Sequence, residues 1–195
     1  MPIAGAVEWS RTAVAAYVVL CSAGAIGVLG AVAVVTNEPF IFPSLGPTAF
    51  MLFYAGMAAA TCPRTVITGH LIGVLAALLG LLLFGLIGAA PDLTSVTWTR
   101  VGAVTVAVGV TVAMMLTLGS VHGPAVATTL IVALGLIGDP LHLAVLMLSV
   151  VGLAVIAFVI NRAVGIPVPR WGPVPEVATR DADPGRPADT PPAVY

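Results

Sequence analysis

The sequence predicts an all-α polytopic membrane protein, and three observations support this fold class. Only 8% of the 195 residues are charged and 59% are hydrophobic, whereas about 25% are charged in an ordinary soluble domain. The apolar residues gather in six segments separated by charges and prolines. The charges concentrate toward the ends of the chain, and those between are Glu38, Arg64, Asp92, Arg100 and Asp139. A soluble domain of this length could not cover so much apolar surface. The composition therefore excludes a soluble globular protein, a disordered chain and a disulfide-stapled secreted domain.

Four of the six segments are long enough to cross a bilayer, because a spanning helix needs about 20 apolar residues. The other two are shorter, and each opens near a Gly-Pro pair. Proline suits a first helical turn, where its missing N–H would be unpaired anyway. The predicted segments are 12–35, 44–60, 66–90, 101–119, 124–138 and 140–161.

The chain divides into an N-terminal segment 1–11, a transmembrane domain 12–162 and a proline-rich tail 163–195, expected to be solvated and disordered. Arg11 precedes the first helix and Arg162 follows the last, so the positive-inside rule predicts that both termini are cytoplasmic. Six crossings are favoured over four, the alternative in which the short segments are re-entrant. Alanine and arginine richness without lysine is typical of a high-GC bacterium, so the expected location is a bacterial plasma membrane, crossed several times.

An internal repeat is also predicted. A shift of 77 positions places Gly46-Pro47 on Gly123-Pro124 and Pro63 on Pro140. The halves, about 12–90 and 100–162, each read as a long helix, a short helix and a long helix. An odd number of crossings per half inverts the second half, which gives a 3+3 inverted repeat of the kind that transporters use. Coincidence is the alternative, because little else matches between the halves.

The two short segments locate a candidate site. A helix that begins inside the membrane leaves its first N–H groups unpaired and carries about half a positive charge there. Two such ends lie at Gly46-Pro47 and Gly123-Pro124. Together they carry about one positive charge and could hold a small anion without a lysine. Nearby hydroxyls are candidate donors, although each could instead bond the preceding helical turn. They are Ser44, Thr48, Ser120, Thr128 and Thr129.

Three stretches resemble the HPP family of small integral membrane proteins, named for a His-Pro-Pro motif. They are Pro43–Ala49 (PSLGPTA), Pro63–Leu71 (PRTVITGHL) and Val121–Ala125 (VHGPA), followed by a family-like Val159–Arg162 exit. Gly123 stands where the family has its first motif proline. The resemblance implies the family's membrane fold and, since members have been assigned to nitrite transport, that activity.

Two residues could act on an anion near these ends. Arg64 could guide an anion toward the pore or pair with a carboxylate; the alternative is a cytoplasmic anchor. His122, directly before Gly123-Pro124, could donate to the anion or change the charge of the site with pH. Its alternative role is to stabilise the turn.

The other two histidines lie in different settings. His70 follows Gly69, which forms a GxxxG pair with Gly73 that lets another helix approach closely. His70 could bond substrate, shuttle a proton or simply join two helices. His142 is expected to be interfacial.

These features favour a channel or secondary transporter for a small monovalent anion such as nitrite, with no cofactor and no catalysis. Metal-ligand spacing, a nucleotide loop and a nucleophile–base pair are all missing from the sequence, and a net charge of −1 gives no basis for binding nucleic acid. The expected partners are a small inorganic anion and the lipid bilayer, and a homo-oligomer stays open. The alternatives are a histidine-dependent membrane enzyme and a non-transporting subunit.

Overall fold

The computed structural model describes residues 9–91, 94 and 96–173. Most of the predicted segment 1–11 and of the tail 163–195 lies outside these residues. The described chain contains six α-helices, one short 3-10 helix and no strand, so the all-α prediction is confirmed. The elements are α1 (Arg11–Thr36), α2 (Leu45–Tyr54), η1 (Ala59–Thr61), α3 (Pro63–Leu83), α4 (Trp98–Thr117), α5 (Pro124–Ala133) and α6 (Pro140–Ala163).

Four of the described helices, α1, α3, α4 and α6, are long and apolar enough to cross a membrane, as predicted. The short helices α2 and α5 have ten residues each. Ten residues rise about 15 Å, which is about half of a 30 Å hydrocarbon core. The predicted segments 44–60 and 124–138 were therefore too long as helices. The first continues into a turn and η1, and the second stops before Gly135, whose φ is 79°.

Local signals in the sequence explain where the helices begin and end. Proline occupies the first turn of α3, α5 and α6, where it is tolerated. Side chains cap α1, α4 and α6 by accepting an N–H three residues later; they belong to Ser10, Thr97 and Asp139. Four helices end in the same way. A left-handed glycine is followed by an N–H that bonds back to a carbonyl five residues earlier. These glycines are Gly85, Gly119, Gly135 and Gly165.

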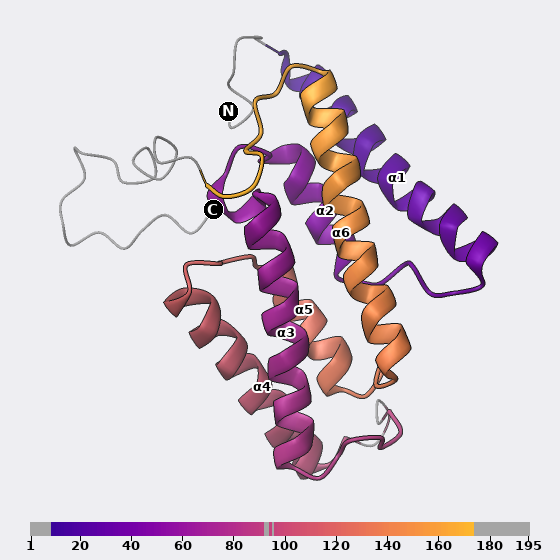
Figure 1. Ribbon diagram of the computed structural model, residues 1–195, viewed down its shortest axis with the longest axis vertical. Helices are drawn as coiled ribbons and strands as arrows, with labels where there is room; N and C mark the ends of the chain where they lie inside the picture. Colours follow the sequence, from indigo (N-terminus) through magenta and orange to yellow (C-terminus); the bar gives the residue numbers. More distant parts are fainter. Residues whose placement is uncertain (1–8, 92–93, 95, 174–195) are drawn as a thin grey trace, which may run out of the picture.

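Helix α3 lies at the centre of the bundle (Figure 1). A large apolar core joins it to α1, α2 and α6, and a smaller one joins it to α4 and α5. Both short helices begin near the middle of the molecule and run toward opposite ends (Figure 1). This long–short–long order, met twice along the chain, is the arrangement that the inverted-repeat hypothesis requires; a symmetry relation between the halves stays a prediction.

Glycines on α3 allow its neighbours to approach to backbone distance. A Cβ atom at Gly73 would lie 2.7 Å from the Ala125 carbonyl oxygen of α5. A Cβ at Gly80 would lie 2.5 Å from the Ala103 carbonyl oxygen of α4. Only glycine fits at these positions, so the close approach predicted from the GxxxG spacing is observed.

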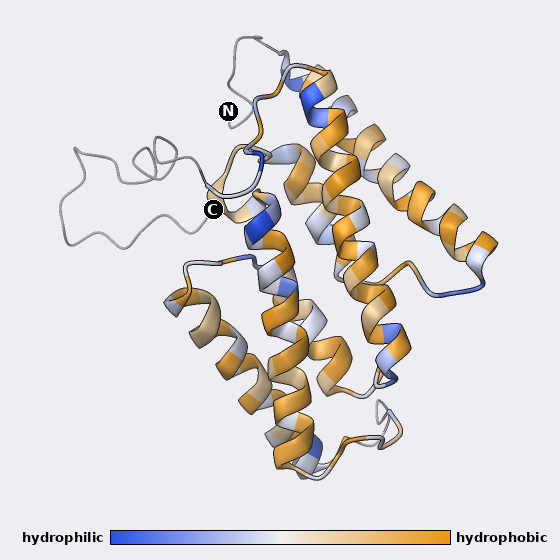
Figure 2. Cartoon of the chain, in the orientation of Figure 1, coloured by the Kyte–Doolittle hydropathy of each residue, from blue (hydrophilic) through white to orange (hydrophobic). Residues whose placement is uncertain are grey.

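Charges separate to the two ends of the bundle, while the helix flanks are apolar (Figure 2). We call one end the arginine end; it carries Arg11, Arg64, Arg162 and Arg170, at the starts of α1 and α3 and at and beyond the end of α6. At the opposite end the half-exposed His142 lies 3.7 Å from Glu38 and 3.6 Å from Asp139. Arg64 lies at the same end as Arg11 and Arg162, as the six-crossing alternative requires. The number of crossings and the end that faces the cytoplasm stay predictions.

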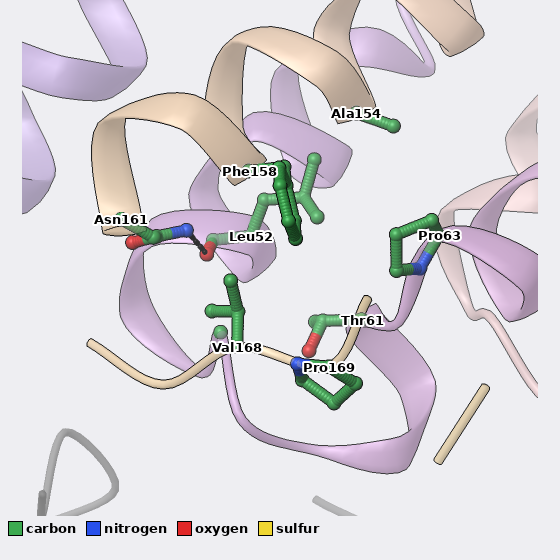
Figure 3. A pocket seen from close by; sticks show the side chains of 9 residues that line it. Leu52, Thr61, Pro63, Ala154, Phe158, Asn161, Val168 and Pro169 are labelled. Carbon is green, nitrogen blue, oxygen red and sulfur yellow. Dashed lines mark hydrogen bonds between the residues drawn. The ribbon is translucent and has the colours of Figure 1, made fainter. Parts of the chain in front are cut away.

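The start of the predicted solvated tail packs against the bundle. Ile166 and Val168 are buried, and the Arg64 N–H donates to the Trp171 carbonyl at 3.0 Å. Figure 3 shows Val168 and Pro169 facing the residues before α3 across a cavity of about 10 Å³, enough for about one water molecule. The packed domain therefore extends past residue 162, because the apolar side chains of this segment find a core to enter.

Buried donors bind the carbonyl ends of both short helices. Asn161 donates from Nδ2 to the Leu52 carbonyl of α2 at 3.1 Å, and Tyr17 donates to Asn161 Oδ1 at 2.6 Å (Figure 3 shows the first bond). Arg100, only 2% exposed, donates from Nη1 to the last carbonyl of α5, that of Ala133, at 3.2 Å. These carbonyls have no partner within their helix and form the negative end of its dipole, so a donor there is stabilising.

Replacing Arg100 by leucine is expected to lower the free energy of unfolding by about 3 kcal/mol, because bonds from a charged donor contribute about 1.5–3 kcal/mol each. The variant loses the bond to Ala133 and a second one, from Nη2 to the Ala90 carbonyl at 2.8 Å. Thermal unfolding in detergent measures the change. Lysine should restore only part of it, since an ammonium cannot reproduce the guanidinium fork. Arg11→Leu, at an exposed arginine, is the control, and equal losses in both variants would contradict this role.

Candidate functional site

Four of the polar side chains singled out in the sequence meet at the centre of the bundle. Thr48 of α2 lies with its Oγ1 3.1 Å from His70 Nε2 and 3.3 Å from His122 Nε2. His70 of α3 lies with its Nδ1 2.7 Å from the Oγ1 of Thr128 on α5. All four side chains are fully buried, and the imidazole centroids are 5.2 Å apart. We call these four residues the histidine cluster.

His122 reaches this position because the neighbouring helix leaves room for it. A Cβ atom at Gly69 would lie 2.9 Å from the His122 Cβ, so Gly69 provides space for the residue. On its other side, His122 Nδ1 lies 2.8 Å from the carbonyl oxygen of Ala60 in η1. The GxxxG glycines thus serve both helix packing and the cluster.

The acceptor at Ala60 sets the direction of the hydrogen bonds. A carbonyl only accepts, so His122 Nδ1 carries a hydrogen. In a neutral His122 the Nε2 atom then accepts, and the Thr48 hydroxyl donates to it. Thr48 Oγ1 in turn accepts from His70 Nε2–H, and the Thr128 hydroxyl donates to His70 Nδ1. In this arrangement the cluster is a single directed chain of neutral groups.

A second arrangement of the same atoms accommodates one more proton. The Thr48 hydroxyl also lies 2.8 Å from the Ser44 carbonyl oxygen. If it donates there, Thr48 Oγ1 can accept from both rings, and His122 then carries hydrogens on both nitrogens. Rotation of one hydroxyl thus makes room for a proton from outside the cluster at His122 Nε2, and the chain becomes cationic while its contacts are kept. The two rings face each other with centroids 5.2 Å apart, and the groups that hydrogen-bond them, from Thr48, Thr128 and Ala60, are not ionisable.

The N-terminal turns of the two short helices lie directly beside the cluster. The N–H groups of Gly46 and Gly123 donate to no other residue that the structure describes, and both glycines are exposed. A Cβ atom at either glycine would meet nothing within 4 Å. Ser44, the N-cap residue of α2, is fully buried, and its hydroxyl has no partner in the described chain. Two backbone N–H groups and one hydroxyl are therefore available as donors.

The other predicted site residues lie around this centre or outside it. Pro47 is exposed and Pro124 is buried, each in the first turn of its helix. Two hydroxyls bond elsewhere: Ser120 Oγ accepts from Thr68 at 2.8 Å, and Thr129 Oγ1 lies 2.8 Å from Thr111 Oγ1.

Arg64 does not belong to the cluster. It is exposed and lies six residues before His70 on α3, which is about 9 Å along the helix axis. Its backbone N–H holds the segment after α6 through Trp171. Sequence reasoning missed the Ala60 carbonyl altogether, because a backbone acceptor in an alanine-rich turn has no signature in the sequence.

The fold and the cluster define the class: a polytopic α-helical membrane protein with a buried centre of histidine and threonine residues. Within the described residues, no group of three His, Cys, Asp or Glu side chains could hold a metal ion. The family model described as the HPP transmembrane region matches residues 5–169. The chain belongs to the HPP family, as its motifs predicted. No match was found among curated proteins or among solved structures.

Proposed function

We propose that this protein is a channel or secondary transporter for a small monovalent anion such as nitrite, held at the N-terminal ends of α2 and α5. The observation that carries the proposal is the meeting of these two ends, which the Thr48–His122 contact of 3.3 Å joins. The N–H groups of Gly46 and Gly123 and the buried Ser44 hydroxyl, none of which donates to a described residue, supply donors there. Helix N-termini favour anions for both reasons, the free donors and the dipole.

The charge of the site matches a single negative charge. Two helix ends of about half a positive charge each total about one elementary charge. No lysine occurs in the sequence, and the described arginines lie at the ends of the bundle. While the histidine cluster is neutral, a divalent anion would leave one charge uncompensated in the membrane interior, which is costly. The site therefore favours monovalent anions small enough to contact both ends.

The histidine cluster behind these ends provides a place for a proton that travels with the anion. When the Thr48 hydroxyl turns to the Ser44 carbonyl, His122 can hold the extra proton without losing a bond. A proton on His122 next to an anion at Gly123 forms a neutral pair, and a neutral pair costs less to hold in the membrane than an anion alone. The proposed transport is therefore coupled to protons through His122.

Purified protein in liposomes tests the function directly. We expect nitrite flux above that of protein-free liposomes. We also expect other small monovalent anions to compete with nitrite and lower its flux. The panel is nitrite, nitrate, chloride and formate. Absence of both flux and binding for the whole panel would overturn the anion proposal, and stable co-purification with another protein would then favour a non-transporting subunit.

Leucine at Gly123 should reduce nitrite flux about tenfold, which corresponds to about 1.4 kcal/mol of lost stabilisation. The side chain would cover the N-terminal end of α5, yet it has room, since nothing lies within 4 Å of a Cβ there. Thermal stability should therefore stay unchanged. The matched control is Gly109→Leu, at an exposed glycine of α4 that also has open space around it. Wild-type flux in a folded Gly123→Leu protein would remove this helix end from the mechanism.

A further inference from the structure

A groove runs between α3 and α6 near the arginine end. Its volume is about 260 Å³. Its walls are apolar except at one end, where an arginine and a tryptophan from the segment after α6 complete it. The lining residues are Pro63, Ile67, Val151, Ala154, Val155, Phe158, Arg170 and Trp171. Figure 3 shows Pro63, Ala154 and Phe158 on the side where the groove adjoins the small cavity.

Three exposed arginines, each from a different segment, either line this groove or adjoin residues that line it. Arg170 lines it directly. The Arg162 guanidinium lies over the ring of Phe158, 5.5 Å from its centroid. Arg64 is held beside Trp171 by its backbone bond of 3.0 Å. The ion pairs found among the described residues both involve His142, at the opposite end of the bundle.

We propose that this groove is a binding site for an anionic phospholipid. An acyl chain would lie along Ile67, Val155 and Phe158, and the phosphate would face the arginines. Arginines beside a groove between transmembrane helices suit an anionic headgroup, because one guanidinium group can donate two parallel hydrogen bonds to two phosphate oxygens. The indole of Trp171 lies at the same level, where tryptophan commonly marks the membrane–water interface.

A second groove in the same protein provides an internal comparison. It lies between α1 and α2, has a volume of about 310 Å³ and is also mostly apolar; among the described residues, Arg11 is the only charged one that lines it. Any lipid chain can occupy either groove. Each groove is lined by one arginine, but the first has a second arginine, Arg162, over its lining residue Phe158, and this extra charge distinguishes the two grooves. The first groove should therefore select anionic lipids.

Trp171 is a native reporter for this site. In a Trp9→Phe, Trp98→Phe background it is the single tryptophan, and its fluorescence can be quenched by lipids that carry brominated chains. In phosphatidylcholine vesicles, we expect quenching by brominated phosphatidylglycerol at about tenfold lower mole fraction than by brominated phosphatidylcholine. A protein that keeps only Trp98, which is exposed at the start of α4, should be quenched equally by the two lipids.

Charge-removing variants test whether the arginines cause the preference. Arg162→Gln with Arg170→Gln should make the two lipids equal quenchers of Trp171, and each single variant should lie between. Arg11→Gln should leave the preference intact. Continued quenching by brominated phosphatidylcholine shows that a variant is folded in the bilayer. The proposal would be overturned if both lipids quenched Trp171 equally in the protein with its arginines intact. An unchanged preference in the double variant, or displacement of the lipid by inorganic phosphate, would overturn it as well.

Discussion

Valine at Gly73 is expected to destabilise the protein by about 3 kcal/mol or more, the upper range for overpacking a closely packed interface. Its Cβ alone would lie 2.7 Å from the Ala125 carbonyl oxygen and 2.9 Å from Thr129 Oγ1. The first of these atoms belongs to the backbone of α5, so relief requires α5 to move away from α3. That movement would also separate Thr128 from His70, which bond across the same interface at 2.7 Å.

The control for this variant is Gly27→Val, at a glycine of α1 with nothing within 4 Å of a Cβ. Both substitutions place the same β-branched residue in a long helix, so helix propensity contributes equally. Size-exclusion chromatography and thermal unfolding in detergent measure the difference. We expect a large loss of folded protein for Gly73→Val and a small change for Gly27→Val. Similar stability of the two variants would show that the α3–α5 contact is not limiting.

The sequence was most informative where one physical effect dominates. Apolar run length identified the four long helices, because crossing a bilayer requires about 20 apolar residues and little else. Proline and glycine marked helix starts and ends, since their backbone limits act locally. The lengths of the two short helices were overestimated for a related reason. Apolar residues continue through Ala58 and Leu136 after α2 and α5 have ended, and hydropathy alone does not distinguish a helix from an apolar turn.

The candidate site was only partly accessible from the sequence. The Gly-Pro repeat brought Thr48 and His122 to attention, but nothing in the sequence pairs His70 with Thr128, which is 58 positions away. Arg100 shows the same limit. In the sequence it is only one of the five charges between the ends of the chain, whereas the structure places its guanidinium at the carbonyl end of α5. Contacts between distant segments depend on packing geometry, and a single sequence does not encode that in a readable pattern.

Thr48→Val should have the largest effect on transport, because among the described residues it is Thr48 that hydrogen-bonds both histidines. Valine keeps the shape of the side chain and removes the hydroxyl. His70 Nε2–H then loses its acceptor at 3.1 Å, and His122 Nε2 loses its donor at 3.3 Å. Leaving two buried polar groups unpaired costs about 2–6 kcal/mol, at about 1–3 kcal/mol each. The rotation that lets His122 accept a proton is also lost, so coupling should fail even in protein that remains folded.

Liposomes with an acidic outer solution separate the loss of stability from the loss of proton coupling. In the wild type we expect the proton gradient to raise initial nitrite uptake, corrected for protein-free liposomes, by about tenfold, which is about 1.4 kcal/mol. In Thr48→Val the gradient should have no effect on uptake. Thr117→Val is the matched control, since that exposed hydroxyl bonds only carbonyls of its own helix. A stable Thr48→Val protein that still responds to the gradient would show that protons do not pass through the histidine cluster, and the anion site at the helix ends would then act without it.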